Sequence, residues 1–390
     1  MNQGKYIFAQ IMEFVPFYHF NQCVKKYQRQ CRAGGLTCWE QFLAMAFGQL
    51  TYRESLRDVV ICLKSQPDKL YHLGFHSQVA RSTLARINEK NDWRIYRDFA
   101  EILIKQARAL YSDGKEFNLE MNGSCYVIDS TTIELCLNVF QWARLVKARA
   151  AIKLHLSLDL TGNIPAFFDI SSAKIRDTKF LDIISIEAGA YYIMDRGYIE
   201  LGRLYHINEA KSFFVIRAKS NLKFRRLYSI KSDKATGVKC DQIVKFVHYY
   251  AAKKYPDKIR RIKYFDKETE KNFVFLTNDF NIEAKTVADL YKHRWQVELF
   301  FKWIKQHLKI KAFWGYSENA VKTQICIAIS VYLLVAIIKK KLNINRNLYE
   351  ILQILSVSPF DKSPIIKLIS EICMDEFQLD NQKQAKLRGF

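Results

Sequence analysis

The segment 291–308, YKHRWQVELFFKWIKQHL, carries residues at spacings that could support chemistry. An α-helix turns by about 100° per residue, so one continuous helix would gather four of its side chains into a stripe about 60° wide, beside its apolar face. These four are Tyr291, Arg294, Glu298 and Lys305. An Arg–Glu pair four residues apart would stabilise the helix by only a few tenths of a kcal/mol and would leave the tyrosine and the lysine unexplained. The stripe therefore predicts a site at the border of the buried face.

Two further acids each follow a short apolar run. Asp129 closes the run in SCYVIDS and Asp195 closes the run in YYIMDRG, so we expect both at the carboxyl ends of strands, where open α/β sheets present ligands. Either acid alone is also compatible with an ordinary Asx-turn. Together with Glu298, they predict three carboxylates in one pocket, which would repel each other unless divalent cations lay between them.

The predicted chemistry is phosphodiester cleavage. Carboxylate oxygens select Mg²⁺, for which Mn²⁺ can substitute, and two such ions about 4 Å apart can activate a water or a 3′-hydroxyl and stabilise the leaving oxygen. Asp129, Asp195 and Glu298 are therefore the candidate catalytic residues and the candidate ligands of two metal ions. Arg294 and Lys305 are expected to contact the phosphates that flank the cut, and Tyr291 is expected to orient the DNA backbone or to stack.

The charge of the chain favours a polyanionic partner. Its 390 residues include 61 Lys or Arg against 39 Asp or Glu, a formal balance of +22, which most often indicates nucleic acid. Residues 201–264 hold 17 Lys or Arg and 4 Asp or Glu, a balance of 17 − 4 = +13, in a stretch whose pattern predicts strands and turns. A sheet with a solvated basic face is the alternative. The candidate DNA contacts in this stretch are Arg225, Arg226, Arg260 and Arg261.

The first part of the chain is predicted to be helical. Thr37 is placed to cap a helix that starts with CWEQFLAMAF, and apolar residues recur at helical spacing as far as residue 111. The short basic segment SQVARSTLARINEK could be the second helix of a helix-turn-helix, with Ser82, Thr83 and Arg86 facing DNA. Short basic helices are common, so an ordinary surface helix is the alternative.

The middle of the chain predicts a mixed α/β domain. The alternation in AIKLHLSLDL predicts a half-buried strand that returns through the turn TGNIP into the strand AFFDISS. Lys153 and His155 fall on the polar side of this strand, so we expect His155 to be exposed and Lys153 to lie near DNA. Asp177 is predicted to cap a helix that starts DTKFLD, and residues 283–308 are predicted to form one helix.

The cysteine pattern and the apolar runs favour a cytoplasmic protein. The 9 cysteines include no Cys-x-x-Cys pair, which indicates reduced thiols rather than a disulfide framework or a zinc site. The N-terminus lacks the features of a signal peptide. The longest apolar run, ICIAISVYLLVAII, is shorter than the ~20 residues that span a membrane, so we expect a buried helix and no membrane partner.

These motifs together resemble a known family. The segment YKHRWQVELFFKWIK matches the Y-x2-R-x3-E-x6-K signature of DDE transposases of the insertion-sequence-four type. VIDSTTIELCL, ARAAIKLHLSLD and YYIMDRGY are similar to the regions around the first two catalytic aspartates of that family, and GQLTYRESLRDV is similar to its small N-terminal domain. The likeness covers nearly the whole chain.

The resemblance implies a fold and a domain organisation. It implies an α/β, ribonuclease H-like catalytic core over residues 116–316, interrupted by a β-rich insertion at about 220–278. A helical DNA-binding domain (1–115) would precede the core, and a C-terminal helical region (317–390) would follow it. By position, the acidic triad of the family falls on Asp129, Asp195 and Glu298, and its phosphate-contacting residues fall on Tyr291, Arg294 and Lys305.

The resemblance also implies an activity and partners. The expected function is that of a bacterial insertion-sequence transposase that binds terminal inverted repeats, cleaves both element ends with Mg²⁺ and joins the 3′-hydroxyls to target DNA. Its partners would be double-stranded DNA and a second copy of the chain in a synaptic complex. The alternatives are a non-catalytic DNA-binding remnant of a transposase and a ribonuclease H-like nuclease that cuts without joining.

Overall fold

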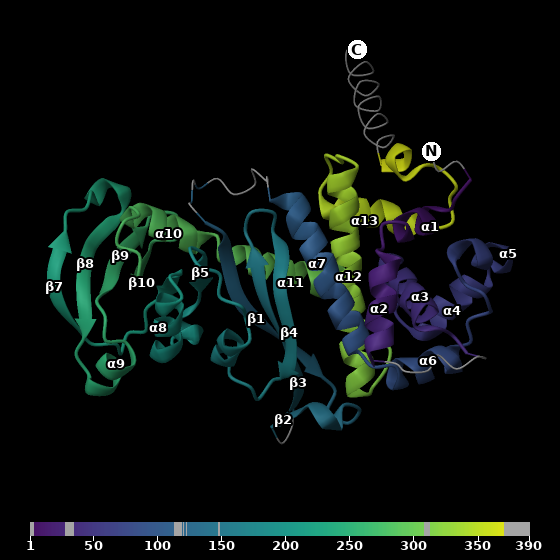
Figure 1. The fold of residues 1–390 in the computed structure, drawn as a ribbon, viewed down its shortest axis with the longest axis horizontal. Helices are drawn as coiled ribbons and strands as arrows, with labels where there is room; N and C mark the ends of the chain where they lie inside the picture. The colour runs from purple at the N-terminus through teal and green to yellow at the C-terminus, as the bar shows by residue number, and fades with distance from the viewer. Residues whose placement is uncertain are drawn as a thin grey trace, which may run out of the picture. The chain divides into compact units, whose positions relative to one another are not determined.

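The computed structural model describes residues 4–27, 35–112, 119, 121, 123–146, 149–307 and 313–369. The chain divides into two compact units. One consists of residues 1–110 and 303–390, and the other consists of residues 111–302. Figure 1 shows the secondary-structure elements of both units.

The first unit is helical, as predicted for the N-terminal part of the chain. The capping box of Thr37 and Glu40 starts α3, because each side chain accepts a backbone N–H of the other residue. The helices are α1 (Ile7–Met12), α2 (Phe17–Tyr27), α3 (Cys38–Leu50), α4 (Leu56–Lys64), α5 (Pro67–Leu70), α6 (Arg81–Lys90), α7 (Arg94–Tyr111), α12 (Glu318–Lys341) and α13 (Leu348–Val357).

Helix α12 forms the centre of this unit. It packs against α3, α6 and α13. In the part of the chain that the structure describes, it is the one helix long and apolar enough to cross a membrane, yet 94% of its most apolar window is buried inside the protein. The expectation of a buried helix at ICIAISVYLLVAII is confirmed.

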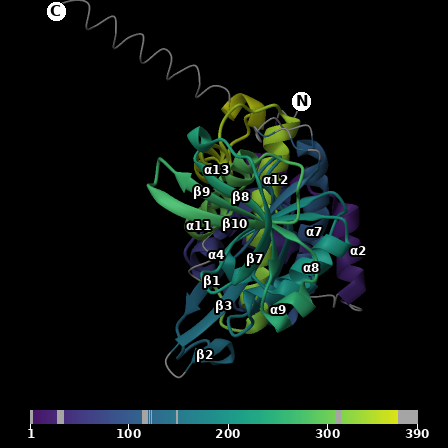
Figure 2. The ribbon, with the colours of Figure 1, turned by 90° about the vertical axis from the view of Figure 1, so that its left-hand side faces the viewer.

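The second unit is built on one mixed sheet. The strands follow the order β2-β3-β1-β5-β6-β10-β9-β8-β7, and β4 pairs with β3. Seen from the β7 end, the strands fan out because neighbouring strands twist relative to one another (Figure 2). The strands are β1 (Cys125–Leu135), β2 (Arg144–Val146), β3 (Arg149–Asp159), β4 (Ile164–Ser172), β5 (Tyr191–Met194), β6 (Phe213–Arg217), β7 (Phe224–Ile230), β8 (Val238–Phe246), β9 (Ile259–Asp266) and β10 (Lys271–Thr277).

Three parallel strands form the middle of the sheet. β1 pairs with β5 from Cys125 to Ile128, and β5 pairs with β6 as far as Met194 and Ile216. Asp195 therefore follows its strand, as predicted. The prediction that Asp129 ends its strand is wrong, because β1 continues to Leu135 through its antiparallel pairing with β3. Asp129 instead lies where the parallel pairing with β5 stops.

The hairpin of β3 and β4 is confirmed, but its predicted polar face is wrong. The two strands pair from Ile152–Ser172 to Asp159–Ile164. His155 is only 2% exposed, because β3 lies between β1 and β4 and the ring of Phe180 stacks on the imidazole at 5.3 Å between ring centroids. The segment at Asp177 is a short 3₁₀ helix, Asp177–Asp182, rather than a helix capped by that aspartate.

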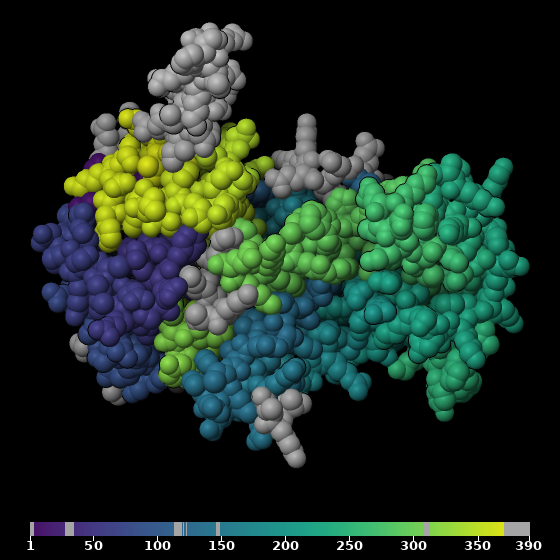
Figure 3. Space-filling model, turned by 180° about the vertical axis from the view of Figure 1, so that it is seen from behind, coloured from purple at the N-terminus to yellow at the C-terminus, as the bar shows by residue number. Residues whose placement is uncertain are grey.

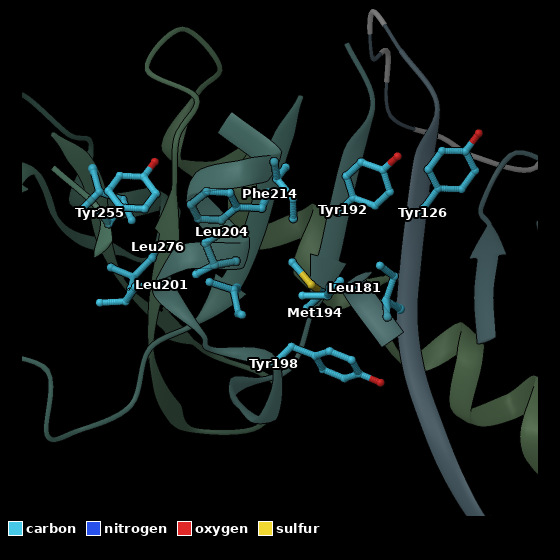
Figure 4. Close-up of a cluster of buried hydrophobic side chains, with 14 of the residues drawn as sticks. Tyr126, Leu181, Tyr192, Met194, Tyr198, Leu201, Leu204, Phe214, Tyr255 and Leu276 are labelled. Atoms are coloured by element: carbon cyan, nitrogen blue, oxygen red, sulfur yellow. The ribbon is translucent and has the colours of Figure 1, made fainter. Parts of the chain in front are cut away.

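The basic strands extend the same sheet. β10 pairs antiparallel with β6, and β9, β8 and β7 follow in order, so the segment between the second aspartate and the glutamate continues the central strands. Helix α8 (Leu201–Glu209) and helix α9 (Tyr249–Lys254) belong to this unit. A buried cluster joins the central and the basic strands; it includes Tyr192, Met194, Leu204, Phe214, Tyr255 and Leu276 (Figure 4).

The predicted single helix over 283–308 is two helices. α10 (Ala284–Lys292) ends before Arg294, and α11 (Trp295–His307) begins after it. Figure 3 shows α10 and the first turns of α11 as a light-green ridge on the surface of the second unit. The break changes the direction of the stripe that a continuous helix would have produced.

Candidate active site

The three predicted carboxylates line one pocket of the second unit. Its volume is about 700 Å³, and its wall includes Asp129 on β1, Asp195 after β5 and Glu298 on α11. Tyr291, at the end of α10, and Arg294, between the two helices, line the same pocket. Two strand positions and a helix break therefore bring these five residues together, although they are separated by up to 169 positions in sequence (298 − 129 = 169).

Arg294 bridges two of the three acids. Its Nη1 donates to Oδ2 of Asp129 at 3.1 Å, and its Nη2 donates to Oε1 of Glu298. The arginine and the aspartate side chains are 19% and 20% exposed, whereas the glutamate side chain is 56% exposed. The carboxylates of Asp129 and Glu298 are thus separated by a single guanidinium group, which neutralises much of their mutual repulsion.

Tyr291 binds the third acid. Its hydroxyl donates to Oδ1 of Asp195 at 3.0 Å, and its ring packs against Phe275 with 4.8 Å between ring centroids. Burial raises the pKa of this tyrosine, and the charge of Asp195 adds to the rise, so the phenol stays protonated and remains a donor. The ring is also within cation–π distance of Arg294, at 5.9 Å.

The pocket perturbs the carboxyl group of Asp129. Burial raises the pKa of Asp129 to about 6, and the negative charges of Glu298 and Asp195 add to the rise. The backbone N–H of Ser130 donates to Asp129 at 2.8 Å and, like Arg294, opposes the rise. A buried carboxylate with two acidic neighbours has a strong preference for a nearby cation.

The donor set fits a hard divalent cation, although the carboxylates are not arranged around one. The three acids and the hydroxyl of Tyr291 supply only oxygen atoms, which are the ligands that Mg²⁺ and Mn²⁺ prefer. Within the described residues, no group of three acidic, histidine or cysteine side chains could hold a metal ion. In this structure the positive charge between Asp129 and Glu298 is supplied by Arg294.

A polar network supports the strand that carries Asp129. The hydroxyl of Ser130 donates to Asp177 at 2.7 Å, and Nζ of Lys153 donates to the same carboxylate oxygen at 2.9 Å and to the carbonyl of Ile175 at 3.0 Å. Lys153, predicted to lie near DNA, thus directs its charge at a carboxylate, and its side chain is 16% exposed. The sequence signal for this network is Ser130, which directly follows Asp129.

The other predicted DNA contacts lie in different environments. Arg225 and Arg226 are exposed on β7, and Arg86 is exposed on α6 together with Ser82, whereas Thr83 is half-buried. Arg260 is only 3% exposed and forms a buried ion pair with Asp241 at 2.7 Å, so the prediction that it contacts DNA is wrong in this structure. Its neighbour Arg261 donates to Gln242 at 3.0 Å. Lys305 lies on α11, half-buried, in the helical unit.

Sequence reasoning missed two arginines of the pocket. Arg196 directly follows Asp195, and Arg217 ends β6, the strand that runs parallel to β5. Both line the carboxylate pocket. The DRG motif contained the first signal, because the arginine next to a strand-end aspartate shares its position at the sheet edge. Arg217 can be assigned to the pocket only when the pairing of β5 with β6 is known.

Comparisons with known proteins identify the family. The family model described as the transposase DDE domain matches residues 121–334, more than half of the chain, and a domain of unknown function (DUF4372) matches residues 3–76. A Sinorhizobium fredii protein named as a transposase is 40% identical over 217 residues, which are 54% of this chain and 60% of that protein. A Geobacillus stearothermophilus protein, named as a transposase for the insertion sequence element IS5377, is 31% identical over 214 residues, 53% of this chain and 55% of its own length.

Two more distant matches complete the comparison. A Synechocystis protein, named as a transposase for the insertion sequence element IS4SA, is 24% identical over 262 residues, 66% of this chain and 71% of its own length. The piggyBac transposase in a synaptic complex with hairpin DNA matches with a TM-score of 0.44 and 10% identity, over 95% of this chain and 82% of that chain. The match to the chain spans 60% and 55% of the length of the first two relatives. The family model covers both aspartates and the signature helix, so the chain belongs to the transposase DDE domain family, which confirms the resemblance to DDE transposases of the insertion-sequence-four type.

Proposed function

We propose that this protein is the transposase of a bacterial insertion sequence, which cleaves phosphodiesters at the ends of the element and joins the freed 3′-hydroxyls to target DNA. The observation that carries the proposal is the pocket in which Asp129, Asp195 and Glu298 meet the tyrosine and the arginine of the signature. Membership of the transposase family supports it, as do the names of the relatives.

The order of the strands supports a ribonuclease H-like core within this proposal. The sheet contains the series β4-β3-β1-β5-β6, in which β3 is antiparallel to both neighbours and β1, β5 and β6 are parallel. Two carboxylates then come from the two adjacent parallel strands β1 and β5. The proposed domain organisation consists of a DNA-binding domain (1–115), a catalytic core (116–316) and a C-terminal helical region (317–390).

Divalent metal ions belong to the proposed chemistry. Asp129, Asp195 and Glu298 would hold Mg²⁺ or Mn²⁺, as two ions in the full site, and the ions would supply Lewis acids for the cleavage of a phosphodiester. The residues of the chain have separate tasks. Tyr291 fixes the orientation of Asp195 through its hydrogen bond. When DNA binds, the guanidinium of Arg294 exchanges its carboxylate partners for the phosphate next to the cut.

The proposed substrate is double-stranded DNA, both as terminal inverted repeats and as target. The excess of +22 charges over the chain supports a polyanionic partner. The exposed basic residues that we assign to DNA are Arg86 on α6 and Arg225 and Arg226 on β7, with Lys305 of the signature as a phosphate contact. Bringing two element ends together requires two copies of the chain, which we propose to meet as a homodimer on DNA.

Glu298→Gln tests the proposed activity. The substitution removes one charge from the pocket and keeps the shape of the side chain, so we expect cleavage of a duplex that carries the element end to fall by at least 10²-fold with Mg²⁺. End binding, measured by mobility shift without metal, should stay within about twofold of wild type, since a rim charge contributes little to affinity. Glu283→Gln is the matched control, because Glu283 is exposed and lies outside the pocket.

The result separates the rival functions. Retained cleavage by Glu298→Gln would remove Glu298 from the catalytic set. Wild-type protein that binds the ends but never cuts them would identify a DNA-binding remnant, and cutting without joining would identify a nuclease.

A further inference from the structure

A second pocket of the same unit has an unusual charge. It encloses about 500 Å³, and we call it the basic pocket. Strands β6 to β10 and the segments that follow β5 and β6 supply its wall. Among the described residues that line it, none is acidic and five are cationic: Arg196, Arg217, Lys219, Arg226 and Arg261.

These five cations have no ion pair among the residues that the structure describes. Arg261 donates to the neutral side chain of Gln242, and Arg217 lies over the ring of Phe273 at 5.1 Å. Arg260, one position from Arg261, shows the contrast, because its guanidinium forms a buried ion pair with Asp241. The buried cation Arg260 is therefore neutralised by an acid of the same sheet, whereas the cations of the basic pocket are not. Like charges gathered without a counterion destabilise the folded protein unless an anion binds there.

The basic pocket adjoins the carboxylate pocket. Arg196 and Arg217 line both of them. Arg196 follows Asp195 directly in the chain, and Arg217 ends the strand that pairs with β5. These two arginines therefore lie at the boundary that the two pockets share.

The size of the basic pocket selects the kind of anion. Pockets of about 300–1,000 Å³ enclose a ligand of the size of a nucleotide or a small drug, and a double helix is far too wide for such a volume. Proteins that hold unpaired strands use a positively charged groove that follows the backbone. The lining has polar side chains as well, namely Ser220, Gln242 and Asn272, which can bind phosphate oxygens without adding charge.

We propose that the basic pocket binds the phosphodiester backbone of a single DNA strand that leaves the carboxylate site. This inference rests on the proposed function, and it adds a binding site and a strand state to it. The pocket, to which Arg226 belongs, holds one DNA strand that is separated from its complement, whereas Arg86 and Arg225, which we assign to the duplex, lie outside its lining.

The test compares two double variants by salt-dependent binding. Lys219→Gln/Arg261→Gln removes two charges from the lining of the basic pocket, and Lys223→Gln/Lys231→Gln removes two charges from exposed positions outside it, none of which we assign to duplex DNA. The probes are a fluorescein-labelled oligothymidine of about 12 nucleotides, which is within the usual site size for single strands, and a blunt duplex of equal length. Anisotropy without metal gives Kd from about 50 to about 200 mM salt.

We expect the pocket variant to lower the slope of log K against log salt for the single strand by about 1.4, since each lost phosphate contact is worth about 0.7. The control variant should leave that slope unchanged, and the duplex slope should be the same for both variants. Equal slopes for the two variants on the single strand would overturn the proposal, as would an equal loss on both probes. If the wild-type protein binds neither probe, the proposed function itself is overturned. Equal melting curves by circular dichroism show that the variants are folded.

Discussion

At the scale of single residues, the site combines three acids with two partners. Asp129 and Glu298 share the guanidinium of Arg294, and Asp195 accepts from Tyr291. The sequence predicted one site of six residues; these five line the pocket, and the sixth, Lys305, is not among the described residues of its wall. The sequence does not predict which of these side chains form hydrogen bonds with each other. The predicted stripe assumes one unbroken helix, whereas Arg294 lies at the break between α10 and α11. The prediction that His155 is exposed is wrong for a different reason. Alternation of polar and apolar residues along a strand does not indicate whether the polar side is also covered by other parts of the chain.

Arg294→Ala tests whether the guanidinium takes the place of a cation. Without it, Asp129 and Glu298 face each other unpaired, and a divalent ion relieves their repulsion. A charged hydrogen bond is worth about 1.5–3 kcal/mol, so we expect Mn²⁺ to bind about tenfold more tightly or better in the absence of DNA. Electron paramagnetic resonance of free Mn²⁺ measures this directly. Arg203→Ala is the control, because Arg203 pairs with Asp182 outside the pocket. Unchanged Mn²⁺ affinity in Arg294→Ala would contradict the substitution of one cation for the other.

His155 gives the fold a specific dependence on pH. Burial lowers the pKa of its imidazole below the ordinary 6.5, Lys153 lowers it further, and the nearby Asp177 and Asp169 act in the opposite direction. Since the unfolded chain then binds the proton more readily, the contribution of neutral His155 is complete above about pH 6.5 and is lost as the pH falls toward the folded-state pKa. Urea unfolding from about pH 7.5 to about pH 5.5 should cost wild type more stability than His155→Gln. Parallel losses in both proteins would show that the imidazole is not the group responsible.

At the scale of elements, the strands that carry the two aspartates depend on a close backbone contact. An added Cβ at Gly123 would lie 2.3 Å from the carbonyl oxygen of Gly189, just before β1 and β5 begin to pair. The strand pattern of the sequence was sufficient to predict β3, β4, β5 and β6. The length of β1 and the pairing of β10 with β6 depend on contacts between segments far apart in the chain, which a local pattern does not contain.

Gly123→Ala should therefore change the geometry of the site, although Gly123 does not line the pocket. The new methyl group forces β1 and β5 apart, at a cost of about 1–3 kcal/mol for an overpacked position. We expect a lower Tm by calorimetry and slower cleavage, because Asp129 and Asp195 move relative to one another. Gly35→Ala is the control, since nothing lies within 4 Å of a Cβ at that position. Normal cleavage by a destabilised Gly123→Ala would indicate that the two strands hold the carboxylates independently of this contact.

At the scale of the whole molecule, composition and charge predicted a partner, and the motifs predicted a chemistry. The basic excess of +22 is divided between buried pairs such as Arg260 with Asp241 and the unpaired cations of the basic pocket. A count of charges cannot separate these two uses, because pairing depends on the three-dimensional neighbours. The family model covers the three acids, and the geometry of the second unit brings them into one pocket.

Joining is the step that makes this molecule a transposase rather than a nuclease. A duplex that ends in a 3′-hydroxyl at the element end needs no first cut, so the protein with Mg²⁺ should insert it directly into plasmid DNA. Two ends are brought together in the proposed dimer, and a mixture of long and short labelled ends should therefore yield plasmids carrying one of each. Gel analysis of wild type beside Glu298→Gln and Glu283→Gln measures the products. Joined molecules from wild type and Glu283→Gln alone are the expected result. If wild type cuts intact ends yet never joins the pre-cut duplex, the core acts as a hydrolase, because water and not the 3′-hydroxyl attacks the phosphate at the pocket lined by Asp129, Asp195 and Glu298.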